Sequence, residues 1–541
     1  MQTTARDSMS IKSKSLYLPL LAAACLILVF LFRGDSGIDS TQDIPGTVLK
    51  SCSSFAAGRL ATVDGSVMAG HTLDGSFDFR VSKIPASRHE NGERVRIDYP
   101  GILGGWKHTI RGLTEIPEVA STYAYFHADC PIGNEYQVFF GENTCPTRKE
   151  LKLLKAGQAY LDWTQVAKLG LQRGKTAREA IQAAGALIEK YGLAGEGESF
   201  LVSDPNEAWC FEIPGFTREW VAQRIPDDHV CPHANRMRIG EVNLDDPANF
   251  MASPNLIKTA RDEGFYNSAK DRAFNFAAVY NDEGMMKNPA NRRREWRMLS
   301  LLCPSNRWDP DAPAYPFSVK PEKKISAKWW LMTVWRDSLE GTPYDKTKAP
   351  AAGPFGSPED PRIPGLNFER SISIGEMTYS WVSQSRAWLP DDIGGVFWFG
   401  LDSSRSTCYT PFHIGISQTP QLYQRGDYTR MSSDSAFWTY QRLDTLSLLR
   451  YRDMHKDIRA RLDSIEEEAF ASQGAIERKA LALYKSNPLE AREFMTSRAE
   501  ELALRAERAA RDLFDLLMAK YRDGMPPATV GEDWLKFLSR R

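Results

Sequence analysis

The sequence predicts an α+β fold, in which antiparallel strands and helices form separate layers, followed by a helical C-terminal extension. Two observations predict this fold. In the first half of the chain, strand-like segments come before and after two segments with helical apolar spacing. From about residue 440 onward the composition is rich in Ala, Leu, Glu and Arg, which favour helix. With 541 residues, 42% of them apolar, the chain has ample core material.

The N-terminal segment, residues 1–33, has the pattern of an export signal. Lys12 and Lys14 precede an apolar run over residues 16–32, and a polar stretch follows it. The run is long for a signal peptide and at the short limit for a spanning helix, so a cleaved signal and a retained membrane anchor both stay open. The basic residues in front predict that the rest of the chain lies outside the cytosol, in the periplasm, at the cell surface or anchored to the membrane.

The pattern changes at Cys52. Residues 34–51 are polar and turn-rich, which predicts a propeptide or linker. The segments "CSSFAAGRLATV" and "SVMAGHTLD" then flank Asp64-Gly65, a dipeptide favoured in two-residue hairpin turns. We therefore expect two antiparallel strands that bring residues 71–77 back beside Cys52.

Further strands and helices follow in order. The segments "EYQVFFGENT", "ESFLVSD" and "AWCFEI" predict strands. Helices are expected over residues 160–173 and after Thr176, a suitable N-cap, with Gly192 as the stop of the second helix. Residues 340–370 are rich in Pro and Gly and predict a long surface connection. Strand-like runs return in "TYSWVSQSRAWLP" and "GGVFWFGLDSS", so the main domain continues past this connection.

Charge and cysteine content exclude some classes of protein. The chain has 68 basic and 69 acidic residues, and no basic stripe interleaved with aromatic residues, so we expect no nucleic-acid partner. Its eight cysteines lack the dense spacing of a disulfide framework. Cys130 and Cys145 could form one pair in an oxidising compartment, or both could stay unpaired.

Cys52 is the leading candidate nucleophile. A single cysteine is by default a small buried apolar residue, and a nucleophilic thiol needs a base to accept its proton. None of the eight histidines has surroundings that mark it as that base. The α-amine of Cys52 itself, with an ordinary pKa near 8, could accept the proton if the Ser51–Cys52 bond were cleaved.

Seven segments give the chain a family resemblance. They are, in order, "SCSSFAAGRLATVDGSVMAGHTLDG", "GNEYQVFFGENT", "GEGESFLVSDPNEAWCFEI", "WVAQRIPDDHVCPHANRMRIGE", "RRREWRML", "TYSWVSQSRAWLPDDIGGVFWFG" and "SSDSAFWTYQRLDTL". Together they resemble the dipeptidase family of cysteine N-terminal-nucleophile hydrolases, which is related to penicillin V acylase and bile salt hydrolase. The resemblance covers residues 52–446.

The resemblance implies a fold, an activity and a partner. The fold would be a four-layer αββα sandwich over residues 52–440, with residues 441–541 as the helical extension. The activity would be hydrolysis of dipeptides by the N-terminal cysteine, with no metal or organic cofactor. Small peptides would be the partners, and the sequence leaves a homo-oligomer and membrane anchoring through residues 16–32 open.

The resemblance also assigns site residues, position by position. Cys52 would be the nucleophile, Asp74 the acidic residue that orients its amine, and Asn143 an oxyanion donor. Asn235 would be a second active-site asparagine. Arg294 would be the active-site arginine, although the register leaves three neighbours as alternatives: Arg292, Arg293 and Arg297.

His71 departs from the pattern of the acylase relatives. They carry an arginine three residues before the acidic residue, and imidazole does not reproduce the charge and fork geometry of a guanidinium. His71 could contact the substrate or be a strand residue without a catalytic part. A second tempting group, His229, Cys231 and His233, offers only three alternating ligands, which is weak evidence for zinc.

Two other functions stay open. One is an N-acyl amidase or acylase of the same superfamily, and the other is a non-catalytic, membrane-tethered binding protein. The agent that would cut before Cys52 also stays open between self-cleavage and a second protease. Signal peptidase does not fit, because Leu49 is not the small residue that its cleavage site requires.

Overall fold

The protein is a mixed α and β structure, as the α+β prediction requires, and the strands of its sheets pair antiparallel. The computed structural model describes residues 52–540, except 76, 104–105, 152, 155–157, 272, 360–368 and 429. Residues 1–51, with the predicted export signal and propeptide, lie outside the described residues.

The larger sheet has six strands in the order β13-β1-β2-β15-β16-β17. Its central strands are nearly continuous runs of buried residues, which is typical of a sheet covered on both faces. The strands are β1 Ser53–Ala57, β2 Val67–Asp74, β13 Val230–His233, β15 Met377–Ser385, β16 Val396–Leu401 and β17 Thr410–His413.

The second sheet has five strands in the order β14-β12-β11-β10-β9. The strands are β9 Phe139–Thr144, β10 Glu198–Ser203, β11 Ala208–Ile213, β12 Val221–Ile225 and β14 Phe250–Ala252. The two sheets approach closely at Gly141 of β9. A Cβ atom built there would lie 3.1 Å from the carbonyl oxygen of Gly70 and 3.4 Å from Cβ of His71, both on β2. The glycine thus lets β9 pack against β1 and β2.

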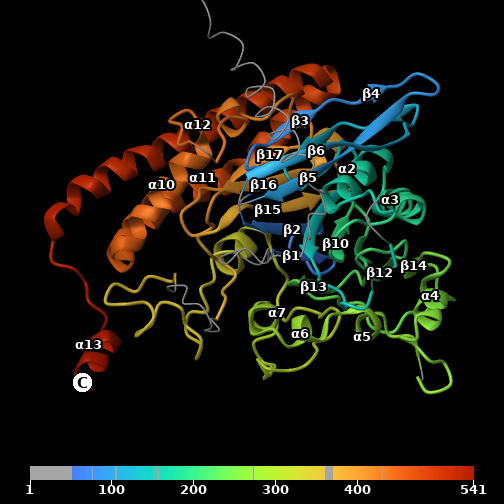
Figure 1. Cartoon of the computed structure of the whole chain (residues 1–541). Helices are drawn as coiled ribbons and strands as arrows, with labels where there is room; N and C mark the ends of the chain where they lie inside the picture. Colours follow the sequence, from blue (N-terminus) through green and yellow to red (C-terminus); the bar gives the residue numbers. More distant parts are fainter. Residues whose placement is uncertain are drawn as a thin grey trace, which may run out of the picture. The chain divides into compact units, whose positions relative to one another are not determined.

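Helices pack on the faces of the two sheets that point away from each other. Helices α2 (Trp163–Arg173) and α3 (Ala177–Tyr191) bury their apolar faces against β10 and β11, as seen beside β10 in Figure 1. On the larger sheet, Phe55 of β1 stacks on Trp330 with ring centroids 3.5 Å apart. Trp330 begins a short π-helix, η1 (Trp330–Val334), which shares this core with α7 (Pro289–Leu302).

The connection between β1 and β2 corrects one prediction. Gly65 adopts a positive φ of 82°, as expected for a turn glycine. The strand before it, however, ends at Ala57 and β2 begins at Val67, so the link is a longer loop and not a two-residue hairpin. The pairing itself is as expected, because Ser53 lies opposite Thr72 and brings the end of β2 beside Cys52.

The helix boundaries follow the predicted local signals. The side chain of Thr176 accepts a hydrogen bond from the backbone N–H of Glu179 at the start of α3, and Gly192 ends this helix at a φ of 70°. Helix α2 begins at Trp163, because the side chain of Asp162 caps it by accepting from the N–H of Gln165.

The last strand is followed by helices α10 (Ala436–Ser447), α11 (Tyr451–Ser486) and α12 (Pro488–Lys520), and then by a short helix near residue 535. Helices α11 and α12 lie side by side and α10 packs against α12 (Figure 1). Asn487 ends α11 and caps α12, accepting from the N–H of Leu489. They join the sheets through Phe470 of α11, which stacks on Trp398 of β16 with centroids 3.8 Å apart.

Shorter elements complete the described chain. They are β3 Ser82–Ile84, β4 Ser87–Arg88, β5 Arg94–Leu103, β6 Trp106–Pro117, β7 Ser121–Thr122, β8 Tyr125–His127, α4 Leu256–Asp262, α5 Phe276–Tyr280, α6 Glu283–Lys287, α8 Ala327–Trp329, α9 Asp391–Gly394, the 3-10 turns Gln421–Tyr423, Leu448–Arg450 and Arg522–Gly524, and α13 Glu532–Leu538. Within the described residues, none of the helices combines the length and the apolar character needed to cross a membrane. The apolar run at 16–32 lies outside them.

Candidate active site

Cys52 lies one residue before β1, and its main chain is held by two other elements. Its carbonyl oxygen accepts a hydrogen bond of 2.7 Å from Nδ2 of Asn143 and one of 2.6 Å from Nη1 of Arg294. Asn143 is on β9 and Arg294 is on α7. Only 1% of the surface of Cys52 is exposed. The start of β1, the second sheet and a helix therefore meet at this residue.

Asn143 joins the two sheets. Its Oδ1 accepts a hydrogen bond from the hydroxyl of Ser54 on β1, so the NH2 group of the same amide is turned toward Cys52. An amide donor fixed in this way could stabilise negative charge that develops on an oxygen beside the thiol.

Arg294 is surrounded by oxygen acceptors. Besides the carbonyl of Cys52, its guanidinium donates to Oγ of Ser53 at 3.0 Å, to Oδ1 of Asn235 at 2.7 Å and to Oδ1 of Asn291 at 2.9 Å. Burial, together with the charge of nearby Arg370, lowers the pKa of Arg294 well below its usual value.

Asn235 is placed by its own backbone. It follows β13 with a positive φ of 51°, a conformation that asparagine tolerates better than most residues. Its Nδ2 donates to the carbonyl of Thr144 at 2.7 Å, directly after Asn143. Asn235 therefore contacts both Arg294 and the end of β9.

The three competing arginines have other partners. Arg292 donates to the carbonyl oxygen of Asp311, Arg293 to the carboxylate of Glu369, and Arg297 to the carboxylate of Asp337. Of the four arginines, Arg294 is the one whose hydrogen bonds reach Cys52. The geometry thus favours Arg294, among the four arginines, as the active-site arginine.

Asp74, at the end of β2, is held by an arginine that the sequence did not predict. Nη2 of Arg370 is 2.5 Å from its Oδ2, and the hydroxyl of Thr72 donates to the same oxygen at 3.2 Å. Burial raises the pKa of Asp74, and the charges of Arg370 and Arg294 oppose this rise. Residues up to 370 were expected to form a surface connection, yet Arg370 is part of the site.

His71 lies against a second unpredicted residue, Glu142. Its Nε2 is 3.7 Å from Oε2 of Glu142, and both side chains are almost completely buried. Burial alone would raise the pKa of Glu142, but the neighbouring imidazole of His71 lowers it. One ligand atom from each of Cys52, His71 and Glu142 lies within 4.8 Å of the others.

The thiol of Cys52 is in a strongly perturbed environment. Burial raises its pKa well above the usual value, and the charges of Glu142 and Asp74 add to the rise. With its nitrogen still in a peptide bond, Cys52 is therefore a neutral thiol at neutral pH. It needs a nearby base before it can act as a nucleophile.

The alternating group at 229–233 does not converge on one point. Nδ1 of His229 is 2.9 Å from Oγ of Ser318, and Cys231 donates to the carbonyl of Phe317 at 3.0 Å. His233 instead joins Cys210 and Glu212, and these three form a second group with ligand atoms within 4.8 Å. Glu212 is already engaged there, since its two oxygens accept from the backbone N–H groups of residues 238 and 239.

Cys130 and Cys145 are both buried, and no disulfide joins them. Cys145 instead donates to the carbonyl oxygen of Asn143 at 3.3 Å. The structure therefore agrees with the alternative in which Cys130 and Cys145 form no disulfide.

The sequence reasoning missed three residues that contact the predicted ones: Glu142, Asn291 and Arg370. Two carried a local signal. Glu142 directly precedes Asn143, and Asn291 is three residues before Arg294 on one helix, a spacing that places both on the same face. Arg370 carried none, because its contact with Asp74 depends on how a long connection returns to the sheet.

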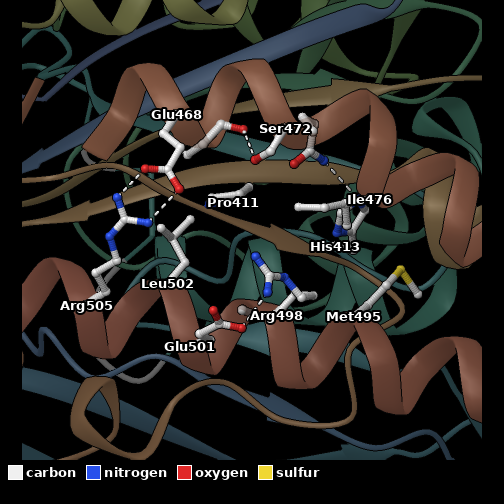
Figure 2. Close-up of a pocket in the computed structure, with 13 residues that line it drawn as sticks. Pro411, His413, Glu468, Ser472, Ile476, Met495, Arg498, Glu501, Leu502 and Arg505 are labelled. Carbon is white, nitrogen blue, oxygen red and sulfur yellow. Dashed lines mark hydrogen bonds and ion pairs between the residues drawn. The ribbon is translucent and has the colours of Figure 1, made fainter. Parts of the chain in front are cut away.

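A hollow elsewhere in the molecule is separate from this cluster. Figure 2 shows it between α11, α12 and β17, with Glu468 and Arg505 paired at one side and His413 at the other. None of the predicted site residues lines it.

Comparisons with known proteins agree on one family. The model of peptidase family C69 matches residues 51–463. A probable dipeptidase of Latilactobacillus sakei is 24% identical over 486 residues, which cover 87% of this chain and 96% of that protein. A probable dipeptidase of Salmonella dublin is 26% identical over 395 residues, 70% of this chain and 83% of that protein. Dipeptidase A of Lactobacillus helveticus is 24% identical over 415 residues, 74% of this chain and 82% of that protein.

Proposed function

The chain belongs to peptidase family C69 and is a hydrolase of peptide bonds, and on this premise we propose that it is an exported dipeptidase whose nucleophile is the thiol of Cys52. The names of the relatives support dipeptides as the substrates. The family match begins at residue 51, directly before Cys52, which supports a mature chain that starts at this cysteine.

The mechanism we propose requires cleavage of the Ser51–Cys52 bond. The new α-amine of Cys52, with an ordinary pKa near 8, accepts the proton of its own thiol. The thiolate attacks the carbonyl carbon of the dipeptide, and Asn143 with a backbone N–H stabilises the oxyanion. The amine then gives the proton to the leaving nitrogen, and water hydrolyses the thioester to release the acyl group and restore the thiol.

The remaining predicted residues have positioning roles in this proposal. Asp74, fixed by Arg370, orients the α-amine of Cys52 and favours its protonated form when the thiolate is present. Arg294 and Asn235 hold the main chain of Cys52 and the end of β9. His71 is retained as a contact near the substrate, and no step requires a metal or an organic cofactor.

One observation supports this assignment most. Cys52, Asp74, Asn143, Asn235 and Arg294 come from five separate segments, and hydrogen bonds or charges connect each of the last four to Cys52 or to its direct partners. A protein that kept the fold only to bind a partner would not need so many buried polar groups around one thiol.

The proposal also covers the fold of the catalytic part and the export of the chain from the cytosol. The two facing sheets, with helices on their outer faces, fit the αββα sandwich of N-terminal-nucleophile hydrolases. We propose residues 52–440 as its catalytic part, residues 441–541 as a helical extension, and residues 1–33 as the signal or anchor that exports it. Residues 34–51 would be the propeptide.

A substrate panel tests the activity. The chain that begins at Cys52 is incubated with dipeptides and with N-acyl amides, and Cys52→Ala, which lacks the thiol, is the control. We expect dipeptides to be hydrolysed with the higher kcat/KM and Cys52→Ala to be inactive. Faster turnover of N-acyl amides would replace the dipeptidase assignment with the acylase alternative, and no turnover by the intact site would favour a binding protein.

A further inference from the structure

A buried imidazole and a carboxylate lie beside the thiol of Cys52 and have no step in the dipeptidase mechanism. They are His71 of β2 and Glu142 of β9, with 3.7 Å between Nε2 and Oε2. The sulfur of Cys52 lies within 4.8 Å of one atom of each side chain, and these two atoms lie within 4.8 Å of each other. Burying two ionisable side chains away from water costs folding free energy. A buried His–Glu pair beside the nucleophile therefore indicates a function for the pair.

The ring of His71 is held by packing, and its Nε2 faces the carboxylate of Glu142. Tyr379 and Trp381 present their rings edge-on to it, with centroids at 6.3 Å and 6.2 Å, and Gly141 packs against its Cβ from the second sheet. Neither ring nitrogen has a hydrogen-bond partner among the described residues. An imidazole held in this way can take up a proton without first breaking another hydrogen bond.

The uncleaved chain needs such a group. Before the Ser51–Cys52 bond is cut, the nitrogen of Cys52 is an amide and cannot act as the base. Burial and neighbouring charges raise the pKa of its thiol, so the thiolate does not form by itself at neutral pH. Asp74, the other nearby carboxylate, is bound by Arg370 and Thr72. Among the described residues, this leaves the His71–Glu142 pair, within 4.8 Å of the sulfur, as the proton acceptor.

We propose that His71, supported by Glu142, accepts the thiol proton of Cys52 in a self-cleavage of the Ser51–Cys52 bond, after which the released α-amine takes over as the base. The inference rests on the proposed function, because it explains how that function's nucleophile is exposed. It assigns the chain two bases that act in sequence on one thiol.

Self-cleavage moves one proton from Cys52 to His71 and back, and it exchanges a peptide bond for a thioester that water hydrolyses. The proton moves from Sγ to His71, and the thiolate attacks the carbonyl carbon of residue 51 to form an S–C bond. The C–N bond to Cys52 breaks, and His71 returns the proton to the departing nitrogen, which becomes the α-amine. Water then hydrolyses the thioester, releasing the carboxylate of Ser51 and the thiol of Cys52. No external oxidant, reductant or metal takes part.

The test compares cleavage of the full chain with hydrolysis of dipeptides. His71→Gln and Glu142→Gln are made in the full chain, and the conversion of purified protein is followed by intact mass. We expect wild-type chain to convert to one that begins at Cys52, and both variants to convert at least about 100-fold more slowly, a loss typical of a missing general base. Glu142→Asp, which keeps the carboxylate, should convert faster than Glu142→Gln. This comparison tests the proposal even if His71→Gln does not fold.

A second version of each chain carries the recognition sequence of a site-specific protease directly before Cys52. Once this protease exposes the α-amine, Glu142→Gln should hydrolyse dipeptides with a kcat within about tenfold of the wild type, whereas His71→Gln, which also removes a contact near the substrate, is compared by its rate of self-cleavage alone. The matched controls are His413→Gln and Glu477→Gln, which alter another His–Glu pair, 3.6 Å apart and largely buried, on β17 and α11. Both controls should self-cleave at the wild-type rate, even though the second is expected to lower stability.

The outcomes separate the inference from the proposed function. Self-cleavage of His71→Gln and Glu142→Gln at the wild-type rate overturns the inference. So does an equal loss of kcat in the protease-cut Glu142→Gln chain, because it would assign the pair to dipeptide hydrolysis or to folding. If wild-type chain is inert until cut and active afterwards, the inference fails and the dipeptidase stands. If cut wild-type chain hydrolyses no dipeptide, the proposed function fails whatever the rate of self-cleavage.

Discussion

At the scale of single residues, Arg294 connects Cys52 to the rest of the site. One guanidinium donates to the carbonyl of Cys52, to the hydroxyl of Ser53 and to the amide oxygens of Asn235 and Asn291. It also donates to the carbonyl of Ala290, one turn back on its own helix. Such a divergent set of acceptors requires the planar fork of arginine, which the single ammonium group of lysine cannot reproduce.

Arg294→Lys should therefore be a severe substitution despite its unchanged charge. We expect the free energy of unfolding to fall by about 3 kcal/mol, because several buried acceptors lose their donor around a buried charge. We expect kcat/KM for a dipeptide to fall by about 100-fold, because the main chain of Cys52 is no longer fixed. Urea unfolding and steady-state kinetics measure the two effects.

The control for this substitution is Arg292→Lys, on the same helix. Arg292 donates to the carbonyl of Asp311 and does not contact Cys52. We expect its loss of stability to stay below about 1 kcal/mol and its kcat/KM to be unchanged. Equal effects of the two substitutions would contradict the role given to Arg294.

The residues that the resemblance assigned to the site lie close together in the structure, but the sequence did not predict all of their partners. Cys52, Asp74, Asn143, Asn235 and Arg294 were assigned by resemblance, segment by segment, and the structure brings them together. The contacts of Glu142 with His71 and of Arg370 with Asp74 were missed because they join residues far apart in the chain. Neither periodicity nor composition encodes which buried charges will meet.

At the scale of elements, an ion cluster attaches α11 to the larger sheet. Glu477 of α11 is 2.7 Å from Nη1 of Arg386, which follows β15, and 3.6 Å from His413 of β17. Burial alone would raise the pKa of Glu477, but the neighbouring imidazole of His413 and the charge of Arg386 outweigh it and lower the pKa to about 2.

This pKa predicts a pH-dependent contribution to stability. Because the folded pKa of Glu477 is below its unfolded value of 4.5, the stabilisation is fully present above pH 4.5 and is lost as pH falls toward 2. Glu477→Gln should lower the free energy of unfolding by about 3 kcal/mol at pH 7, and the difference from wild type should shrink below pH 4.5. Urea unfolding at several pH values measures it, and a difference that does not vary with pH would contradict this account.

Elements with local signals were predictable, and long-range geometry was not. Thr176 and Gly192 bound α3 because capping chemistry acts within one turn of the helix. The Asp64-Gly65 turn was recognised, but its loop is longer than expected because β1 leaves the sheet at Ala57. Strand order could not be read from the sequence, since β13, from the middle of the chain, pairs beside β1.

At the scale of the whole molecule, the C-terminal helices are joined to the sheets by buried polar contacts. The carboxylate of Glu466 on α11 is fully buried. It accepts from the backbone N–H of Tyr409 at 2.8 Å and pairs with Arg336 at 2.7 Å and with Arg459 at 2.8 Å. The described residues belong to one compact unit.

A chain that ends at residue 450 should therefore fail to fold cooperatively. It would leave Arg336 without the buried carboxylate of Glu466 and would expose the face of Trp398 that Phe470 covers. A chain that ends at residue 525, which lacks only α13, is the control and should retain the thermal transition of the full protein. Circular dichroism and size-exclusion chromatography measure both, and a folded, monomeric chain ending at 450 would contradict the prediction.

The central claim is that this peptidase becomes active when Cys52 becomes the first residue. The most direct test is the N-terminal sequence and intact mass of the protein purified from its native host, measured together with its hydrolysis of dipeptides. We predict a chain that begins at Cys52 and is active. Active protein in which Cys52 is still preceded by Ser51 would contradict the claim, because the thiol would then work without the α-amine as its base.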